Sequence, residues 1–199
     1  SADFEVEVRR AGFKRALWAR TCPLTIDVDL HHLKLKKDWK YRRNKANKSD
    51  LLDSRLIEKP SADDIGKFLG AFTEMKEAKS IGFVPSFDEI NTLLQDPSVK
   101  LFFIEDQIGL VAARIIWVHK ERAFDIYAAN TNRARNCSAS HKLLLEIFES
   151  LKALEVKLFD FGRVGPCQGD LDSVFVFKRG SGGQVISYNG EWVKSRSTI

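Results

Sequence analysis

The sequence has 199 residues, of which 44% are apolar, and a formal net charge of +5. It contains no run near the roughly 20 apolar residues that span a bilayer, and residues 1–10 lack the apolar core of a signal peptide. The cysteines, Cys22, Cys137 and Cys167, are far apart and form no CxxC pair, which argues against a disulfide framework and a zinc site. The sequence thus predicts a soluble, cytoplasmic protein with no bound metal.

The positive charge is concentrated near the N-terminus. Residues 1–60 carry fifteen Lys and Arg against nine Asp and Glu, and most of this excess lies in HHLKLKKDWKYRRNKANK, residues 31–48. Such a density usually marks a surface for phosphates or other polyanions, although a solvated helix face is the alternative. The candidate polyanion-binding residues are Lys36, Lys37, Arg42 and Arg43.

Apolar and charged residues alternate at 4–8 and at 24–30, which predicts two strands. Residues 35–47 contain neither Gly nor Pro and favour a helix. Its Trp39 either docks the helix on the sheet or stacks on a base. A short strand is expected at residues 55–58.

Two helix starts follow in the chain. Ser61 is a candidate N-cap with Asp64 three residues later, and SFDE at 86–89 is a capping box. From Val99 the strand period predicts a meander of three antiparallel strands, and then a helix capped by Ser138 or Ser140. The apolar stretches KLFDFG and QVISYNGEWV are each expected to form one strand, so the element order predicts an α+β domain.

This order of elements resembles the core of the GNAT superfamily of acyltransferases. In that superfamily the turn before the helix usually binds the pyrophosphate of acetyl-coenzyme A through backbone N–H groups. The equivalent stretch here, RARNCSASHKLL, contains no glycine, so its backbone is poorly suited to wrap a pyrophosphate. We therefore expect acetyl-coenzyme A to bind poorly.

Three stretches more closely resemble the Fem family of peptidyltransferases, which add amino acids from aminoacyl-tRNA to peptidoglycan precursors. They are TIDVDL with the basic segment, YAANTNRARNCSASHKLLLEIFESLKALEVKLFDFG, and FVFKRGSGG. The resemblance implies a GNAT-like fold, with a central mixed, largely antiparallel sheet flanked by helices. Residues 1–30 would be N-terminal strands, as in a remnant of a preceding domain, and 31–199 the acyltransferase domain.

The resemblance also implies the substrates. The acyl donor would be aminoacyl-tRNA or an acyl thioester such as acyl-CoA, with no cofactor bound tightly, and the acceptor an amine. Possible partners are tRNA and either a partner domain or a second copy of the chain. The alternative function is a noncatalytic, degenerate module that binds nucleic acid or another polyanion through its basic helix.

By resemblance, Lys178 in FVFKRGSGG would stabilise the oxyanion that forms when an amine attacks an ester carbonyl. A surface lysine is the alternative, and Arg179 is expected to be solvated. Phe177 would anchor the stretch, while the glycines Gly180, Gly182 and Gly183 would let the next strand pass close to the substrate.

Four residues are candidates for substrate binding. Tyr127 and Asn130 end the meander, near the acceptor entrance of GNAT-like folds, and Arg163 follows the FDFG strand. Arg114 lies among apolar strand residues and must either face outward or pair in the groove. Asp160 is expected to be structural, holding the turn or pairing with Arg163. A Cys137–His141 dyad is conceivable, but an inert thiol is the better interpretation.

Overall fold

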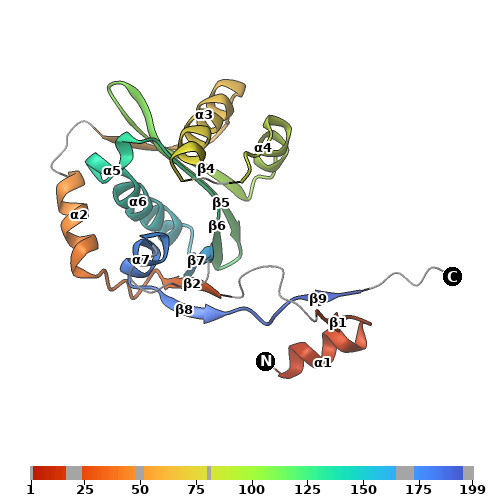
Figure 1. Cartoon of the computed structure of the whole chain (residues 1–199). Coiled ribbons are helices and arrows are strands. Elements are labelled where there is room, and N and C mark those ends of the chain that lie inside the picture. Colours follow the sequence, from red (N-terminus) through yellow and green to blue (C-terminus); the bar gives the residue numbers. More distant parts are fainter. Residues whose placement is uncertain (1, 17–23, 48–51, 80–81, 165–172, 195–199) are drawn as a thin grey trace.

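The computed structural model describes residues 2–16, 24–47, 52–79, 82–164 and 173–194 (Figure 1). In chain order its elements are α1 (Ala2–Arg10), β1 (Lys14–Arg15), β2 (Leu24–Asp29), α2 (Lys37–Asn47), β3 (Asp53–Ile57), α3 (Ala62–Lys79), α4 (Phe87–Leu94), β4 (Val99–Asp106), β5 (Gly109–His119), β6 (Arg122–Asn130), α5 (Arg133–Cys137), α6 (Ala139–Ala153), β7 (Leu158–Arg163), α7 (Ser173–Gly180), β8 (Gln184–Ser187) and β9 (Trp192–Val193). No helix in these ranges is long and apolar enough to cross a membrane.

Seven strands form the central sheet, in the order β3-β4-β5-β6-β7-β2-β8. All neighbouring strands in this sheet are antiparallel except β6 and β7, which run parallel. The predicted α+β fold with a mixed, largely antiparallel sheet is therefore confirmed. The N-terminal strand β2 lies between β7 and β8, so it is part of this sheet; its origin in a preceding domain stays a prediction.

Helices cover both faces of the sheet (Figure 1). On one face α2, α6 and α7 enclose a core that contains Trp39, Phe148 and Phe159, with Phe177 packed against it. On the other face α3 and α4 enclose a second core around Phe68. The α3 and α4 helices contact β4, β5 and β6.

The predicted helix starts are confirmed by their caps. The hydroxyl of Ser61 accepts a hydrogen bond from the N–H of Asp64 at 3.2 Å, and that of Ser86 accepts one from the N–H of Glu89 at 3.1 Å. These bonds satisfy N–H groups that a first helical turn leaves without partners. The three-strand meander and the helix at the basic segment also form as predicted.

Two strand predictions are wrong. Residues 4–8 belong to the helix α1, where the ion pairs Glu5–Arg9 and Glu7–Arg10 join residues at helical spacing. QVISYNGEWV forms two strands, because the chain turns at Gly190, whose φ of 88° suits glycine. Its first part, β8, pairs with β2, and its second, β9, pairs with β1 outside the main sheet.

Candidate active site

The parallel strands β6 and β7 pair only where residues 122–124 meet 158–160. Beyond this point β6 continues to Asn130 and β7 to Arg163 without pairing to each other. We call the region where residues 125–130 of β6 and 161–163 of β7 no longer pair with each other the β6–β7 opening. Main-chain groups on its two edges need partners other than the neighbouring strand.

Lys178, on α7, provides such a partner at the β7 edge. Carbonyl groups alternate sides along a strand, and that of Gly162 faces β2, where the Thr25 hydroxyl donates to it at 2.8 Å. The carbonyls of Phe161 and Arg163 therefore face the opening. The ammonium of Lys178 donates to both, at 2.8 and 3.2 Å, which places a cation at this edge.

Arg114 and Asp125 form a buried ion pair at the same opening, with side chains 5% and 6% exposed. Arg114 therefore forms an ion pair inside the protein and does not face the solvent. Burial raises the pKa of Asp125, while the charges of Arg114 and Lys178 act to lower it. Asp125 was not among the site residues predicted from the sequence, although a charged residue in each of two adjacent apolar strands was a signal for such a pair.

Asp160 lies within β7, beside the irregularity in the pairing of β7 with β2, and does not pair with Arg163. Its buried carboxylate accepts hydrogen bonds from the N–H of Gly162 at 2.8 Å, from the Thr25 hydroxyl and from the Tyr188 hydroxyl. The guanidinium of Arg163 instead lies 3.8 Å from Glu191. The structural role expected for Asp160 agrees with these bonds.

The candidate binding residues are not brought together. Arg163 and Arg114 lie at the opening, but the ring of Tyr127 packs against Phe68 on the α3 face of the sheet. The Tyr127 hydroxyl donates to Glu89, and burial together with this carboxylate raises its pKa to about 12.

Asn130, the last residue of β6, contacts side chains of the two helices α3 and α6. Its amide nitrogen lies 3.8 Å from the sulfur of Met75, and its amide oxygen accepts a hydrogen bond from Ser140. Ser140 is therefore held by β6, and the residue at the N-cap of α6 is Ser138, whose side chain makes no capping bond. The glycine-free stretch before α6 forms the short helix α5 and the left-handed Ser138, φ 58°.

The three glycines of FVFKRGSGG allow close packing within the protein. A Cβ atom on Gly180 would lie 2.4 Å from the ring of Trp39, one on Gly182 2.2 Å from the carbonyl oxygen of Lys34, and one on Gly183 2.6 Å from Ile26. They bring α7 and its following turn against the α2 segment and β2. These contacts explain the glycines by packing within the protein, and the expected approach of the next strand to the substrate stays a prediction.

The basic helix α2 is docked by Trp39, whose indole N–H donates to the carbonyl of Phe177 at 2.8 Å. Trp39 is buried and so does not stack on a base, while Tyr41 is exposed. Of the predicted polyanion-binding residues, three are exposed and Arg42 is half-buried. Arg42 lies 3.5 Å from Asp38.

Cys137 and His141 do not form a dyad. The thiol of Cys137 donates to the carbonyl of Arg133, whereas His141 packs against the rings of Trp39 and Phe177, both at 4.9 Å. Cys22 and Cys167 lie outside the described residues. In the described part of the chain, no three His, Cys, Asp or Glu side chains are grouped to hold a metal ion.

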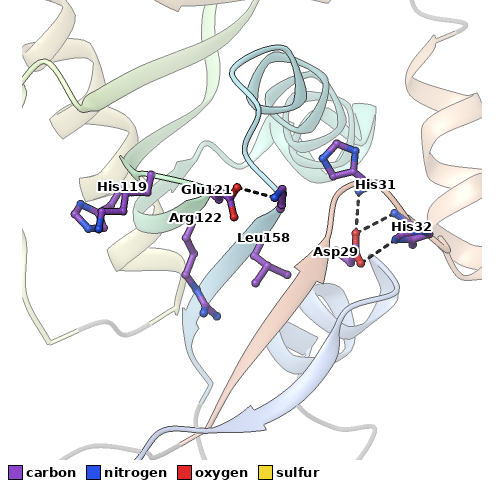
Figure 2. Close-up of a pocket in the computed structure, with 9 residues that line it drawn as sticks. Asp29, His31, His32, His119, Glu121, Arg122 and Leu158 are labelled. Atoms are coloured by element: carbon purple, nitrogen blue, oxygen red, sulfur yellow. Dashed lines mark hydrogen bonds and ion pairs between the residues drawn. The ribbon is translucent and has the colours of Figure 1, made fainter. Parts of the chain in front are cut away.

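A hollow of about 690 Å³ lies at the other end of β6 and β7, near the turn between β5 and β6 (Figure 2). Its lining residues are Asp29, His31, His32, His119, Lys120, Glu121, Arg122, Lys157 and Leu158. Glu121 forms an ion pair with Lys157, and Figure 2 shows Asp29 bonded to His31 and His32. None of the sequence-predicted site residues lines it, so the candidate active site is the β6–β7 opening.

Comparisons with known proteins agree with this architecture. Residues 34–179 match the family described as "Acetyltransferase (GNAT) domain". The crystal structure of FemX aligns with a TM-score of 0.75 at 10% identity over 96% of this chain and 67% of that one. The C-terminal domain of a putative lysylphosphatidylglycerol synthetase from Agrobacterium fabrum aligns with a TM-score of 0.66 at 16% identity, over 93% of this chain and 63% of that one. L-PGS from Bacillus licheniformis aligns with a TM-score of 0.65 at 14% identity, over 98% of this chain and 66% of that one.

At these identities the solved structures show a shared fold, and this chain spans about two thirds of their length. They bear out the resemblance to Fem-type transferases at the level of the fold. Among curated proteins, no sequence is similar enough to match. Because the family match extends over most of the chain, the protein belongs to the family of GNAT acetyltransferase domains and is an acyltransferase by its family.

Proposed function

We propose that the protein transfers an acyl or aminoacyl group from an activated donor to an amine, at the β6–β7 opening. The observation that carries this proposal is the Lys178 ammonium, held 2.8 Å from the Phe161 carbonyl where β7 has left β6. When the amine attacks an ester or thioester carbonyl, a C–N bond forms and negative charge develops on the carbonyl oxygen. As the intermediate collapses, the acyl C–O or C–S bond breaks and the donor leaves as an alcohol or thiol, which takes up the proton that the amine loses. A cation fixed beside that oxygen stabilises the transition state more than the ground state.

The donor is aminoacyl-tRNA or an acyl thioester, and acetyl-coenzyme A is a poor ligand. In support, the stretch before α6 is occupied by α5 and a left-handed Ser138, and it has no glycine to bring backbone N–H groups around a pyrophosphate. Calorimetry is expected to detect no tight binding of acetyl-coenzyme A. A micromolar dissociation constant would make the protein an ordinary acetyltransferase.

The acceptor is an amine on a cell-wall or polysaccharide precursor, met in the cytoplasm. This finer assignment is supported by the Fem-like sequence stretches and by the structural likeness to FemX. The exposed cations of the α2 segment would hold phosphates of the donor or acceptor, with Lys36, Lys37 and Arg43 as the main contacts. A partner domain or a second copy of the chain would complete the acceptor side.

A second candidate function is noncatalytic polyanion binding through α2. The observation that favours it is the row of exposed cations, while Asp38 is the only acid in this helix. The two functions differ in their need for Lys178, because a binding module would hold its polyanion without a cation in the β6–β7 opening.

A transfer assay with charged tRNA and an amine-bearing, nucleotide-linked precursor tests the proposal. We expect product with the wild-type protein and almost none with Lys178→Met, with Arg179→Met as the matched control. A thermal-shift series with coenzyme A, charged tRNA and the precursor shows which ligand the folded protein binds. Binding of tRNA without any transfer, unchanged in Lys178→Met, would instead support the noncatalytic module.

A further inference from the structure

The ion pair of Arg114 and Asp125 is buried and has no role in the proposed function. Arg114 binds one oxygen of the Asp125 carboxylate. The other oxygen, Oδ1, is buried and accepts no hydrogen bond from any described residue. A buried ion pair seldom stabilises a fold more than apolar side chains of the same size would. The stability of the fold therefore does not account for this pair.

Three observations place the pair next to Lys178. The guanidinium of Arg114 lies 5.9 Å from the ring of Phe177, the residue before Lys178. A Cβ atom on Gly162 would lie 3.2 Å from the main-chain oxygen of Asp125, and the carbonyls on both sides of Gly162 bind Lys178. The charge of Lys178 also acts on the Asp125 carboxylate. Two cations and one anion thus lie close together, and of these Arg114 and Asp125 are buried.

We propose that Asp125 is a positioning residue that holds Lys178 in the β6–β7 opening as an ammonium. Without the carboxylate, Arg114 and Lys178 would repel each other in a region of low dielectric, and Lys178 would lose its proton more easily or turn toward solvent. Arg114 in turn holds the carboxylate in place through one of its two oxygens. The inference rests on the proposed function for the use of Lys178 in acyl transfer, but its charge state can be measured independently.

Other charged groups surround this cluster. Asp160, on β7, adds negative potential at Asp125. Lys79 from α3 and His141 from α6 lie within the field of Arg114. Among these groups, Asp125 is the carboxylate on which the charges of Arg114 and Lys178 both act.

The test is a pH titration by NMR of protein labelled with ¹³C at the lysine Cε atoms, in which the Lys178 signal is identified by its loss in Lys178→Met. We expect Lys178 to lose its proton at a pH lower by about one unit or more in Asp125→Asn. In Arg114→Gln, where the carboxylate faces Lys178 alone, we expect deprotonation at a higher pH. Equal titration in all three proteins, or shifts of the opposite sign, would overturn the proposal.

The control is Glu89→Gln, which removes a carboxylate on the α3 and α4 side of the sheet and should leave Lys178 unchanged. If Asp125→Asn does not fold, the comparison of the wild-type protein with Arg114→Gln still decides, since an unchanged titration there rejects the proposal. The NMR titration and the proposed function can fail separately. Full activity of Lys178→Met would show that Lys178 is not catalytic, but it would not change what the titration says about the effect of Asp125 on Lys178. In the transfer assay, Asp125→Asn should lower kcat with little change in KM. The fall of kcat at alkaline pH should also begin at a lower pH than in the wild-type protein.

Discussion

The basic segment around α2 and the end of α7 both place cations on a helix, but they use them differently. In α2 the cations are mostly exposed, and the helix is attached by the apolar and aromatic Trp39. In α7 one cation, Lys178, reaches main-chain carbonyls of β7, while its neighbour Arg179 donates to the carbonyl of Gly183 at 2.6 Å. Charge density along the sequence therefore says little about chemistry, and the surroundings of each cation decide its role.

The two regions are also in direct contact. The indole of Trp39 donates to the Phe177 carbonyl, and the N–H of Lys36 donates to the carbonyl of Gly180 at 3.0 Å. His141 packs against Trp39 and Phe177 from α6. A change at this junction should therefore affect α7, and through it the position of Lys178.

The largest expected effect is the loss of catalysis in Lys178→Met. The methionine keeps the apolar stem but removes the cation, so kcat should fall roughly 100-fold or more with little change in KM. Arg179→Met should leave kcat nearly unchanged and cost about 1 kcal/mol of stability, because it loses the bond to Gly183. Steady-state kinetics with the true substrate pair measures both variants. Full activity of Lys178→Met would make the Lys178 contacts purely structural.

The second effect concerns the junction of α2 and α7. In Gly180→Ala the added methyl would lie 2.4 Å from the Trp39 ring, so the free energy of unfolding should fall by about 1–3 kcal/mol. Gly70→Ala is the matched control, because it lies inside α3 with no atom within 4 Å of the added carbon, and it should stabilise by about 0.5–1 kcal/mol. Urea denaturation of both proteins compares them. Equal stability of the two variants would contradict the close packing of Trp39 on α7.

The third effect is a loss of stability in acid that depends on His141. Burial, with Arg42 acting in the same direction, lowers the pKa of His141 to about 4. Below about pH 6.5 the unfolded chain takes up a proton that the folded protein accepts only near pH 4. Stability should therefore fall between pH 6.5 and 4, by about 1–2 kcal/mol after allowance for partial exposure of the ring.

His141→Phe keeps an aromatic ring between Trp39 and Phe177 but removes the titrating group. In this variant the fall in stability between pH 6.5 and 4 should be smaller by the same amount. Unfolding curves at a series of pH values measure the difference. The same pH dependence in both proteins would show that His141 is not the group responsible.

The smallest effect per side chain is expected at the α2 surface. Neutral replacements there should change the free energy of unfolding by no more than about 0.5 kcal/mol. They should weaken the salt dependence of polyanion binding, so that the slope of log K against log salt concentration falls by up to about 0.9 for each phosphate that is no longer neutralised. The replacements are Lys36→Gln, Lys37→Gln, Arg42→Gln and Arg43→Gln. Filter binding across a salt series compares them with Lys67→Gln and Lys100→Gln, which lie outside α2. An unchanged slope would make α2 a solvated face.

Some features could be read from the sequence because they depend on residues close together in the chain. The caps at Ser61 and Ser86 and the alternation in the meander fixed helix starts and strands before any tertiary contact was known. Local patterns failed at residues 4–8, because alternating apolar and charged residues also suit an exposed helix with ion pairs one turn apart. They also failed at QVISYNGEWV, where one glycine directs the two halves to different partners.

The sequence by itself determined the fold class, the helix caps and the basic segment, because periodicity, capping and composition act locally. Lys178 became a candidate through the resemblance of its stretch to the Fem family. Only the tertiary structure decided that Arg114 pairs with Asp125, that Tyr127 faces α3, and that the glycines after α7 fit against α2 and β2. These outcomes depend on strand register and on where β6 and β7 separate. A bulge between Ile115 and Ile116 shifts that register, and no local sequence pattern specified it.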